Sequence, residues 1–286
     1  MTTEAIQKAE ERLGQADLPA VVTEKWQRLI RILQSYPAAV TAYSGGVDSG
    51  FLAYAVYLVQ GDRMLAVTVD SGLDAPEQGE FALQFAREIG FRLEKLALNA
   101  FDIPELIGNP PDRCYFCKKA ILNLLWDYAR QHGYSIVLEG QNMDDESDYR
   151  PGRRAVRESG TRSPLVESGL QKVEIRQLAR ALDLRIWNRP SSPCLATRFP
   201  YGTAITQKGL EQVAAGEAYL AQLGFPASRV RYYQDMARIE TPPDRIEDLI
   251  AARVQVVAFF RSLGFNHIAV DLAGYRQGSM NEGLEK

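Results

Sequence analysis

The sequence predicts an α/β fold: a doubly wound, mainly parallel sheet followed by a smaller α+β domain. Short β-rich apolar runs alternate with helical patterns through residues 1–188. These runs lack a clear polar–apolar alternation, which is typical of parallel strands that helices cover on both faces. The order of elements then changes, so we expect one domain at residues 1–188 and a second at 189–286.

The first domain is expected to begin with helices at residues 5–14 and 24–36, the second of them capped by Thr23. A regular rhythm of strands and helices follows. Its elements are, in chain order, strand 38–43, helix 49–60, strand 64–69, helix 77–89, strand 92–97, helix 115–132 and strand 136–139. A last helix at 171–182 carries Lys172 and is interpreted as a structural brace.

The second domain is expected to begin after a long irregular loop that is rich in proline and serine. The elements that follow are helix 206–223, strands 229–233 and 236–240, helix 244–263 and strand 267–271. Such a mixed order is typical of a small α+β domain.

Residues 44–49 read Ser-Gly-Gly-Val-Asp-Ser and join a strand to a helix. Gly45 and Gly46 permit a tight turn, and we expect a positive φ at Gly46. The N–H groups and dipole of the following helix favour an oxyanion, to which the hydroxyls of Ser44 and Ser49 can donate. No Gly-Lys-Ser/Thr occurs, so the segment predicts a phosphate cradle of a kind other than the Walker loop. The alternative is an ordinary turn with a serine cap.

Carboxylates are expected at the same edge of the sheet, because ligands of doubly wound folds bind at the carboxyl ends of strands. Asp70 and the segment 140–145 follow two of the expected strands. Mg²⁺ bridges phosphates and one or two carboxylates, so Asp48, Asp70, Asp144 and Asp145 are candidate ligands. Turn and cap formation is an equally good interpretation of these aspartates.

The composition restricts the class of protein. Apolar residues make up 46% and charged residues 24% of the 286 residues, which is ordinary for a globular protein. A net charge of −3 argues against nucleic acid as a partner. No apolar run is long enough to span a membrane, and the polar start of the chain has no signal-peptide core, so we expect a cytoplasmic protein.

Three cysteines are present: Cys114 and Cys117 in a Cys-Tyr-Phe-Cys segment, and Cys194 far along the chain. In a reducing compartment, an odd number argues against a disulfide framework. The pair alone is compatible with a redox pair, half of a zinc site or part of an iron–sulfur site. A structural zinc site needs four ligands, and only His132 and His267 remain to complete it. Three thiolates fit an iron–sulfur cluster with one open iron, and three inert buried cysteines are the alternative.

Two arginines alternate along the expected strand 229–233, so Arg229 and Arg231 share one of its faces. Arginine suits phosphate because its guanidinium donates two parallel hydrogen bonds. Other charged residues of the second domain are candidates to line the same pocket. They are Glu217, Glu240, Asp248 and Arg276.

Several segments together resemble one known family. They are 44–49, 112–118 (Asp-Arg-Cys-Tyr-Phe-Cys-Lys), 139–145 (Glu-Gly-Gln-Asn-Met-Asp-Asp), 148–152, 163–165, 172–176, 193–198 (Pro-Cys-Leu-Ala-Thr-Arg) and 274–279. In this combination the chain resembles the LarE-type sulfur transferases of the PP-loop ATP pyrophosphatase superfamily, over roughly residues 20–280. The resemblance implies the PP-loop, adenine-nucleotide α-hydrolase-like fold, followed by a sulfur-transfer or substrate domain.

The resemblance also implies a reaction. The family activates a carboxylate of pyridinium-3,5-biscarboxylic acid mononucleotide with ATP and converts it to a thiocarboxylate, in the synthesis of the nickel-pincer nucleotide of lactate racemase. One version of the family gives up the sulfur of a single cysteine, at the position of Cys194. Another holds a [4Fe-4S] cluster with three cysteines and delivers sulfide from it. This chain has all three, so it resembles the cluster version.

The family pattern assigns residues to three kinds of site. ATP-binding residues are Ala42, Ser44, Gly45, Gly46, Val47, Asp48, Ser49, Asp70, Gly140 and Asp144. Substrate-binding residues are Glu217, Arg229, Arg231, Glu240, Asp248 and Arg276, and the catalytic and cluster-binding residues are Cys114, Cys117 and Cys194. Mg²⁺, a sulfide donor and a homo-oligomer are implied as well.

Three other functions remain open on the same fold. A tRNA thiolase also combines a PP-loop with cysteines, but it needs a basic surface for phosphates, and this chain is acidic. A nucleotide-amidating synthetase would leave the cysteines without a role. A nucleotide-binding module without turnover would bind ATP and release no pyrophosphate with any acceptor.

Overall fold

The computed structural model describes residues 2–146, 151–191 and 193–276. Parts of the motifs at 148–152 and 274–279 therefore lie outside the described residues. In the described part of the chain, no helix is long and apolar enough to cross a membrane.

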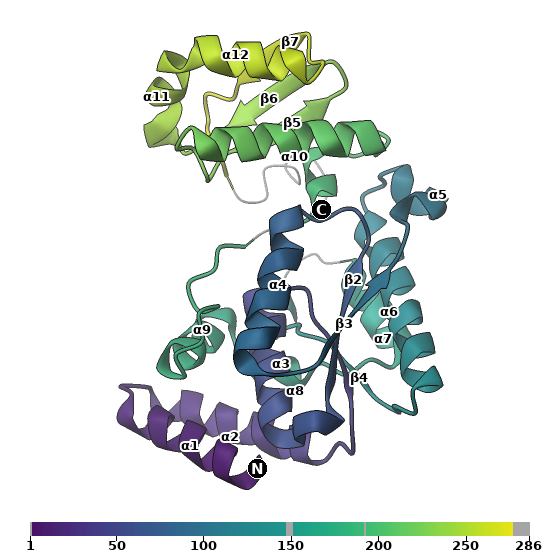
Figure 1. Cartoon of the computed structure of the whole chain (residues 1–286), viewed down its shortest axis with the longest axis vertical. Coiled ribbons are helices and arrows are strands. Elements are labelled where there is room, and N and C mark those ends of the chain that lie inside the picture. The colour runs from purple at the N-terminus through teal and green to yellow at the C-terminus, as the bar shows by residue number, and fades with distance from the viewer. Residues whose placement is uncertain (1, 147–150, 192, 277–286) are drawn as a thin grey trace. The chain divides into compact units, whose positions relative to one another are not determined.

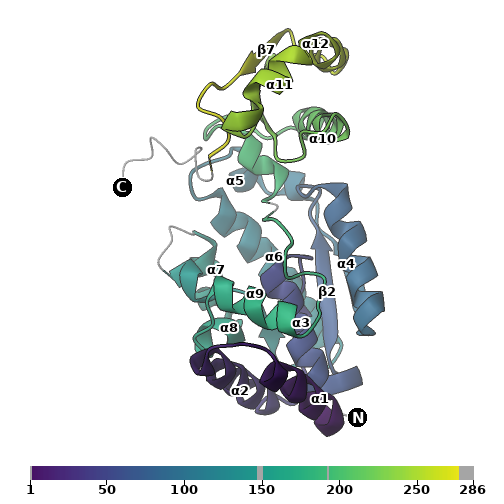
Figure 2. The ribbon, with the colours of Figure 1, turned by 90° about the vertical axis from the view of Figure 1, so that its left-hand side faces the viewer.

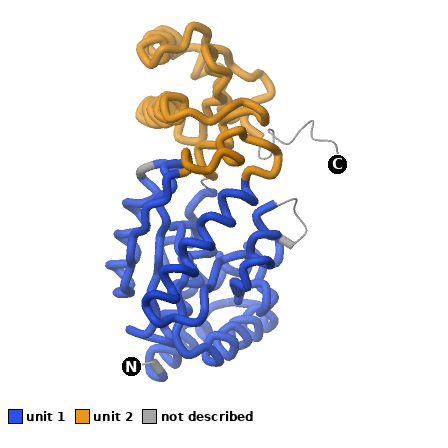
Figure 3. Tube along the Cα trace, turned by 90° about the vertical axis from the view of Figure 1, so that its right-hand side faces the viewer, with its two compact units in different colours: residues 1–99, 114–192 blue, residues 100–113, 193–286 orange. Residues whose placement is uncertain are grey.

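The chain divides into two compact units. Unit 1 comprises residues 1–99 and 114–192, and unit 2 comprises residues 100–113 and 193–286 (Figure 3). The boundary expected from the sequence, between residues 188 and 189, lies close to the last of these crossings. Residues 100–113 also belong to unit 2, which the sequence did not predict. A short segment between a strand and a long helix has no sequence pattern that shows which unit it packs against.

A four-stranded sheet forms the centre of unit 1. Its strands are β1 (Val40–Ala42), β2 (Leu65–Asp70), β3 (Leu93–Ala97) and β4 (Val137–Leu138). They lie in the order β3-β2-β1-β4, and every neighbouring pair is parallel, which confirms the α/β class predicted from the sequence. The order reverses at β1, because the chain adds β2 and β3 on one side and β4 on the other. Such a reversal leaves a crevice at the carboxyl ends of the strands, where ligands of these folds bind.

Helices cover both faces of this sheet (Figure 1). Ala66 and Leu138 point to one face and pack with Phe51, whereas Val40 and Val137 point to the other. The helices of the first face are α1 (Thr2–Gln15), α2 (Ala20–Gln34), α3 (Val47–Gln60), α4 (Pro76–Ile89), α8 (Pro164–Glu167) and α9 (Lys172–Ala181). Those of the second face are α6 (Arg113–Gln131) and α7 (Gly152–Ser159). Figure 2 shows α9 beside α3, against which it packs.

Unit 2 contains a three-stranded sheet with helices on its apolar face. Its strands are β5 (Arg229–Tyr233), β6 (Met236–Glu240) and β7 (His267–Val270), and its main helices are α10 (Gln207–Gln222) and α12 (Arg253–Ser262). β5 and β6 form an antiparallel hairpin, and β7 pairs with β6 in parallel. Val230 and Ile239 are fully buried, and a Cβ on Gly216 of α10 would lie 3.0 Å from Phe260 of α12. The helices therefore pack closely on this side.

The segment 100–113 joins unit 2 through one buried amide. It contains the short helix α5 (Pro104–Ile107), followed by Asn109. The Nδ2 group of Asn109 donates to the carbonyl oxygens of Phe199, Pro200 and Thr203, at 3.3, 2.8 and 3.0 Å. Its Oδ1 accepts from Arg113 Nη1 at 2.8 Å. The side-chain amide is thus hydrogen-bonded at both ends, as burial requires.

Some expected elements differ from the observed ones. The second helix begins at Ala20 with Pro19 at its N-cap, so Thr23 lies inside it and is not its cap. The expected helix 244–263 is divided into a 3-10 turn (Pro243–Arg245), α11 (Ile246–Ala251) and α12. Between the two α-helices, the N–H of Ala252 still bonds to the carbonyl of Asp248, but Ala252 itself leaves α-helical geometry, with φ −80° and ψ 5°. Short helices α5, α7 and α8 were not predicted from the sequence. They are too short for periodicity to reveal.

Candidate functional site

The segment 44–49 forms a turn between β1 and α3 that its own hydroxyls hold in shape. The N–H of Ser44 donates to Ser49 Oγ at 3.2 Å, and the two serine Oγ atoms lie 3.1 Å apart. Ser49 Oγ also donates to the carbonyl of Gly46 at 3.3 Å. Gln78 of α4 donates to the carbonyl of Ser44 at 3.0 Å. These bonds fix the turn, and none of them uses the N–H groups of Val47, Asp48 or Ser49.

The left-handed residue of the turn is Gly45, with φ +77°, and not Gly46 as expected from the sequence. Gly46 is extended, with φ −77° and ψ 169°, and caps α3, which begins at Val47 rather than at Ser49. A Cβ on Gly45 would lie 3.1 Å from the carbonyl oxygen of Gln78 and 3.2 Å from Ala82 Cβ. Conformation and space both require glycine at position 45, whereas at Gly46 a Cβ meets nothing closer than 3.5 Å.

The first turn of α3 supplies the positive end of a helix dipole. The first intrahelical bond runs from Gly50 N to the carbonyl of Gly46, so the N–H groups of Val47, Asp48 and Ser49 have no intrahelical acceptor. No side chain caps this end of the helix. Open N–H groups and the dipole together favour an anion such as a phosphate group.

Gly140 brings the end of β4 against this turn. A Cβ at position 140 would lie 2.9 Å from both the nitrogen and the Cα of Ser49. Real Cβ atoms do not approach backbone this closely, so any larger residue would displace the cradle. Ala42 lies half-buried at the end of β1 and Val47 is buried, so these two ATP-binding candidates contribute backbone and packing.

Asp48 and Lys172 form an ion pair beside the cradle. Lys172 Nζ lies 2.5 Å from Asp48 Oδ2, and the backbone N–H of Lys172 donates to Asp144 Oδ2 at 2.9 Å. The start of α9 is thereby held by both aspartates. The Oδ1 atom of Asp48 is buried and has no hydrogen-bond partner among the described residues. Lys172, interpreted from the sequence as part of a brace, is a residue of this site, and its distance of 124 positions from Asp48 left no local signal.

Asp70 lies at the carboxyl end of β2 and is exposed. A hydrogen bond from Lys95, with Nζ 2.7 Å from Asp70 Oδ2, and a second bond from the N–H of Gly72 lower the pKa of this carboxyl group. Asp70 is therefore charged and oriented at neutral pH.

Glu139 precedes Gly140 and has a buried carboxylate. It was not predicted from the sequence to belong to any site. It accepts from the hydroxyl of Ser163 and, at 3.1 Å each, from the N–H of Gln141 and from Lys118 Nζ. Its charge is compensated and its oxygens are occupied, so it fixes the backbone that leads into Gly140.

The three cysteines are divided between the two units. Cys114 and Cys117 occupy the first turn of α6 in unit 1, three residues apart, so their side chains project from neighbouring positions of the helix surface. Cys194 belongs to unit 2 and caps the 3-10 turn Leu195–Arg198. Among the described residues, no group of three or more histidine, cysteine, aspartate and glutamate residues is gathered closely enough to hold a metal ion.

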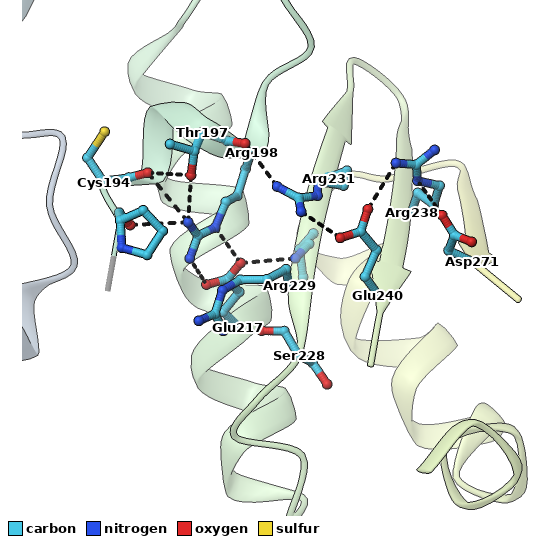
Figure 4. Close-up of polar contacts among 12 residues, drawn as sticks. Cys194, Thr197, Arg198, Glu217, Ser228, Arg229, Arg231, Arg238, Glu240 and Asp271 are labelled. Carbon is cyan, nitrogen blue, oxygen red and sulfur yellow. Dashed lines mark hydrogen bonds and ion pairs between the residues drawn. The ribbon is translucent and has the colours of Figure 1, made fainter. Parts of the chain in front are cut away.

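A chain of charged pairs runs across unit 2 from Cys194 to the polar face of its sheet (Figure 4). Arg198 and Glu217 form a two-pronged pair, with Nε–Oε1 and Nη2–Oε2 distances of 2.8 Å. On the sheet, Arg231 Nη2 lies 2.6 Å from Glu240 Oε2, and Arg238 Nη2 lies 2.9 Å from Glu240 Oε1. Glu240 and Arg231 are almost completely buried. These are compensated charges, as burial demands.

Of the six sequence-predicted substrate residues, Glu217 lies on α10 and pairs with Arg198, and the other five fall into two groups. Arg229, Arg231 and Glu240 lie on one face of the β5–β6 hairpin, where Arg229 pairs in register with Glu240 and Arg231 with Arg238. Arg229 is half-buried, its guanidinium lies over the ring of Tyr275, and its Nε has no hydrogen-bond partner among the described residues. The other group comprises Asp248, which is exposed on α11 and pairs with Arg245, and Arg276, which is exposed after β7.

Comparisons with known proteins agree with this geometry. No family model matches the chain. The chain is 40% identical over 268 residues to an uncharacterised protein of Synechocystis, covering 93% of this chain and 100% of that protein. It is 38% identical over 268 residues to the pyridinium-3,5-bisthiocarboxylic acid mononucleotide synthase of Lactiplantibacillus plantarum, covering 93% of this chain and 97% of the synthase. It is 29% identical over 154 residues, 51% of this chain and 50% of the relative, to one subunit of the glutamine-hydrolysing GMP synthase of Methanococcus vannielii.

The parallel sheet, its reversal at β1 and the open helix end after Ser-Gly-Gly-Val-Asp-Ser define a nucleotide-binding α/β protein of the PP-loop type. Within that class, the extent and identity of the match to the bisthiocarboxylic acid mononucleotide synthase decide the family. The chain belongs to the LarE-type sulfur transferases, and it is an enzyme.

We predict that Gly140→Ala damages nucleotide binding. The added methyl group would meet backbone at Ser49 that cannot move without moving the cradle, and such overpacking costs about 1–3 kcal/mol. ATP affinity, measured by titration calorimetry, should fall by about tenfold or more. Gly14→Ala is the matched control, because a Cβ at this exposed position of α1 meets nothing within 4 Å. Unchanged ATP affinity in Gly140→Ala would contradict the close contact.

Proposed function

We propose that this protein adenylates a carboxylate of pyridinium-3,5-biscarboxylic acid mononucleotide with ATP and converts it to a thiocarboxylate, as a step in nickel-pincer nucleotide synthesis. The observation that carries the proposal is the 38% identity to a pyridinium-3,5-bisthiocarboxylic acid mononucleotide synthase along 93% of the chain. The phosphate cradle without a Walker lysine supports the use of ATP in adenylation rather than phosphoryl transfer.

The chemistry requires activation because oxide is a poor leaving group. A carboxylate oxygen attacks the α-phosphorus of ATP, the bond to the bridging oxygen of the β-phosphate breaks, and pyrophosphate leaves. The open N–H groups of Val47, Asp48 and Ser49 would stabilise the leaving pyrophosphate. Sulfide then attacks the acyl carbon, the C–O bond to AMP breaks, and the thiocarboxylate and AMP are released.

Mg²⁺ would accompany the ATP. Asp48 fits it best among the four candidate carboxylates, because one of its oxygens is buried beside the cradle without a partner among the described residues. Asp145 Oδ2 accepts from the N–H of Asn142 at 3.1 Å. Asp70 and Asp144 each already accept hydrogen bonds, from Lys95 and from the N–H of Lys172. Lys172 neutralises Asp48 in the absence of the metal and would reduce its repulsion of the phosphates.

The cysteines fit part of a [4Fe-4S] site. Cys114 and Cys117 lie at neighbouring positions of one helix, which suits two ligands of one cluster, and Cys194 would be the third ligand. When bound, the cluster would supply a sulfide at the iron that lacks a cysteine ligand. In the alternative, Cys194 gives up its own sulfur and each chain acts once. The sulfide donor, the homo-oligomer and the cytoplasmic location remain predictions.

Other functions of the fold have less support. The GMP synthase relatives match about half of this chain, and amide formation leaves the three cysteines without a role. A tRNA thiolase needs phosphate contacts over a basic surface, and the net charge is −3. A binding module without turnover would release no pyrophosphate with any acceptor.

Incubation with ATP, Mg²⁺ and the biscarboxylic acid mononucleotide is expected to yield AMP and pyrophosphate. The reason is the cradle, which would hold the β- and γ-phosphates as a leaving group. Chromatography of the nucleotides and a pyrophosphate assay check the outcome. ADP and phosphate in their place would exclude adenylation, and binding of ATP without products would favour the module.

The two arginines of β5 are expected to differ. Arg229→Ala should weaken the mononucleotide by about tenfold to a hundredfold, the effect of losing a charge-assisted hydrogen bond, and should keep the stability of the protein. Arg231→Ala should lower the free energy of unfolding by about 3–5 kcal/mol, because it breaks a buried ion pair. Titration calorimetry and urea unfolding measure these effects, and equal loss of stability in both variants would contradict the distinction.

The fate of Cys194 separates the two sulfur-transfer mechanisms. The cluster mechanism predicts that anaerobically purified protein contains iron and sulfide, and that alanine at Cys114, Cys117 or Cys194 removes the cluster and the activity. Mass spectrometry after turnover should then show an intact Cys194. Loss of one H₂S from Cys194, with activity retained in Cys114→Ala, would establish the sacrificial mechanism instead.

A further inference from the structure

We infer that Arg198 is the residue that positions Cys194 for sulfur transfer, by clamping the main chain of residues 193–198 to α10 and β5. The inference rests on the proposed function, because the position of Cys194 affects sulfur transfer only if the protein carries out that reaction. The clamp itself is a property of unit 2 alone, and it acts on the main chain of Cys194. It therefore applies whether Cys194 binds a cluster or gives up its own sulfur.

Every nitrogen of the Arg198 guanidinium is engaged in this clamp. Nε and Nη2 donate to the two oxygens of Glu217, each at 2.8 Å. Nη1 donates to Thr197 Oγ1 at 2.7 Å and to the carbonyl of Pro193 at 3.1 Å, and it lies 3.4 Å from the carbonyl of Cys194. The side chain is 4% exposed. A buried guanidinium whose three nitrogens all donate within the protein is poorly placed to bind a substrate phosphate, so its role is internal.

The carbonyl oxygen of Cys194 accepts several of the hydrogen bonds in this turn. It accepts from the N–H of Thr197 at 3.0 Å and from the Thr197 hydroxyl at 2.8 Å, besides its contact with Arg198. The Thr197 hydroxyl thus donates to Cys194 and accepts from Arg198. Figure 4 shows the sulfur of Cys194 pointing away from these groups. The bonds hold the backbone and leave the sulfur directed elsewhere.

The clamp reaches the arginine face of the sheet by two routes. Glu217 Oε1 accepts from the N–H of Val230 in β5 at 3.0 Å, so Arg198 is fixed to the strand that carries Arg229 and Arg231. Arg231 Nη1 donates to the carbonyl of Thr197 at 2.9 Å, which ties the same turn to the sheet directly. Cys194 is consequently held at a set position relative to the face proposed to bind the substrate phosphate. Reaction rates depend steeply on such positions.

Lysine cannot replace arginine in this clamp, because an ammonium group is a single point with no planar fork. Arg198→Lys keeps the charge and removes the geometry. We expect the release of pyrophosphate to stay within about twofold of wild type, since the cradle lies in unit 1, and the formation of thiocarboxylate to fall by about a hundredfold. The ratio of pyrophosphate to thiocarboxylate should rise accordingly, while the KM for the mononucleotide stays unchanged.

Two further variants keep the test independent of folding defects. Thr197→Val removes the shared hydroxyl with little change in size and should raise the same ratio. Arg261→Ala removes an exposed arginine at the end of α12 and should leave the ratio at the wild-type value. Guanidinium chloride should partly restore thiocarboxylate formation in Arg198→Ala, and sodium chloride at the same ionic strength should not.

Hydrogen exchange tests the clamp without any reaction. The amide of Thr197 should exchange roughly two- to tenfold faster in Arg198→Lys, the factor that corresponds to about one hydrogen bond. A wild-type ratio in both Arg198→Lys and Thr197→Val, or unchanged exchange at Thr197, would overturn the inference. If the wild-type protein forms no thiocarboxylate, the proposed function fails, and the exchange measurement still decides whether the clamp exists.

Discussion

The first turn of α3 has to keep its N–H groups open to an anion, and the residues around it satisfy that requirement. Hydrogen bonds among Ser44, Ser49 and the carbonyl of Gly46 hold the turn without using the N–H groups at the start of the helix. Gly45 lets α4 approach on one side, and Gly140 lets β4 approach on the other. Because no side chain of the described residues caps this helix end, its N–H groups are available to water or to an anionic ligand.

Charge compensation is the corresponding constraint in unit 2. Its sheet has one face covered by α10 and α12 and another that carries the side chains of Arg229, Arg231, Arg238 and Glu240. Burying guanidinium groups is costly unless carboxylates and carbonyl oxygens accept from them. The resulting pairs limit which arginines can still bind a ligand. Arg229, with an unpartnered Nε among the described residues, retains that capacity, whereas the guanidinium of Arg198 is committed to its own turn and to Glu217.

Local patterns predicted much of this molecule. The alternation of strands and helices and the turn at residues 44–49 depend on consecutive residues. Periodicity and the placement of glycines were therefore enough to locate β1, α3 and the turn between them. Which glycine is left-handed was predicted wrongly, because the choice of Gly45 depends on the approach of Gln78 and Ala82 from α4. The residues beside the glycine in the sequence do not show which distant residues will contact it in the folded chain.

Pairs of distant residues were the other part that the sequence did not reveal. Lys172 meets Asp48 across 124 positions, and Arg198 meets Glu217 across 19 positions and an intervening loop. The segment 193–198 was singled out for its cysteine, whereas the arginine that ends it received no role. A buried arginine close to a candidate reactive cysteine is the signal that would have drawn attention to it, but burial is a property of the folded chain.

Two of the cysteines, Cys114 and Cys194, lie beside places where the chain passes from one unit to the other. The chain passes from unit 2 to unit 1 between Arg113 and Cys114, and it enters unit 2 again just before Pro193 and Cys194. On the unit 2 side of the first crossing, Arg113 is buried and bonded to Asn109, which binds three carbonyl oxygens between residues 199 and 203. Cys114 and Cys194 are therefore each attached by covalent structure to one of these crossings. Both cysteine-bearing segments therefore begin where the chain changes from one unit to the other.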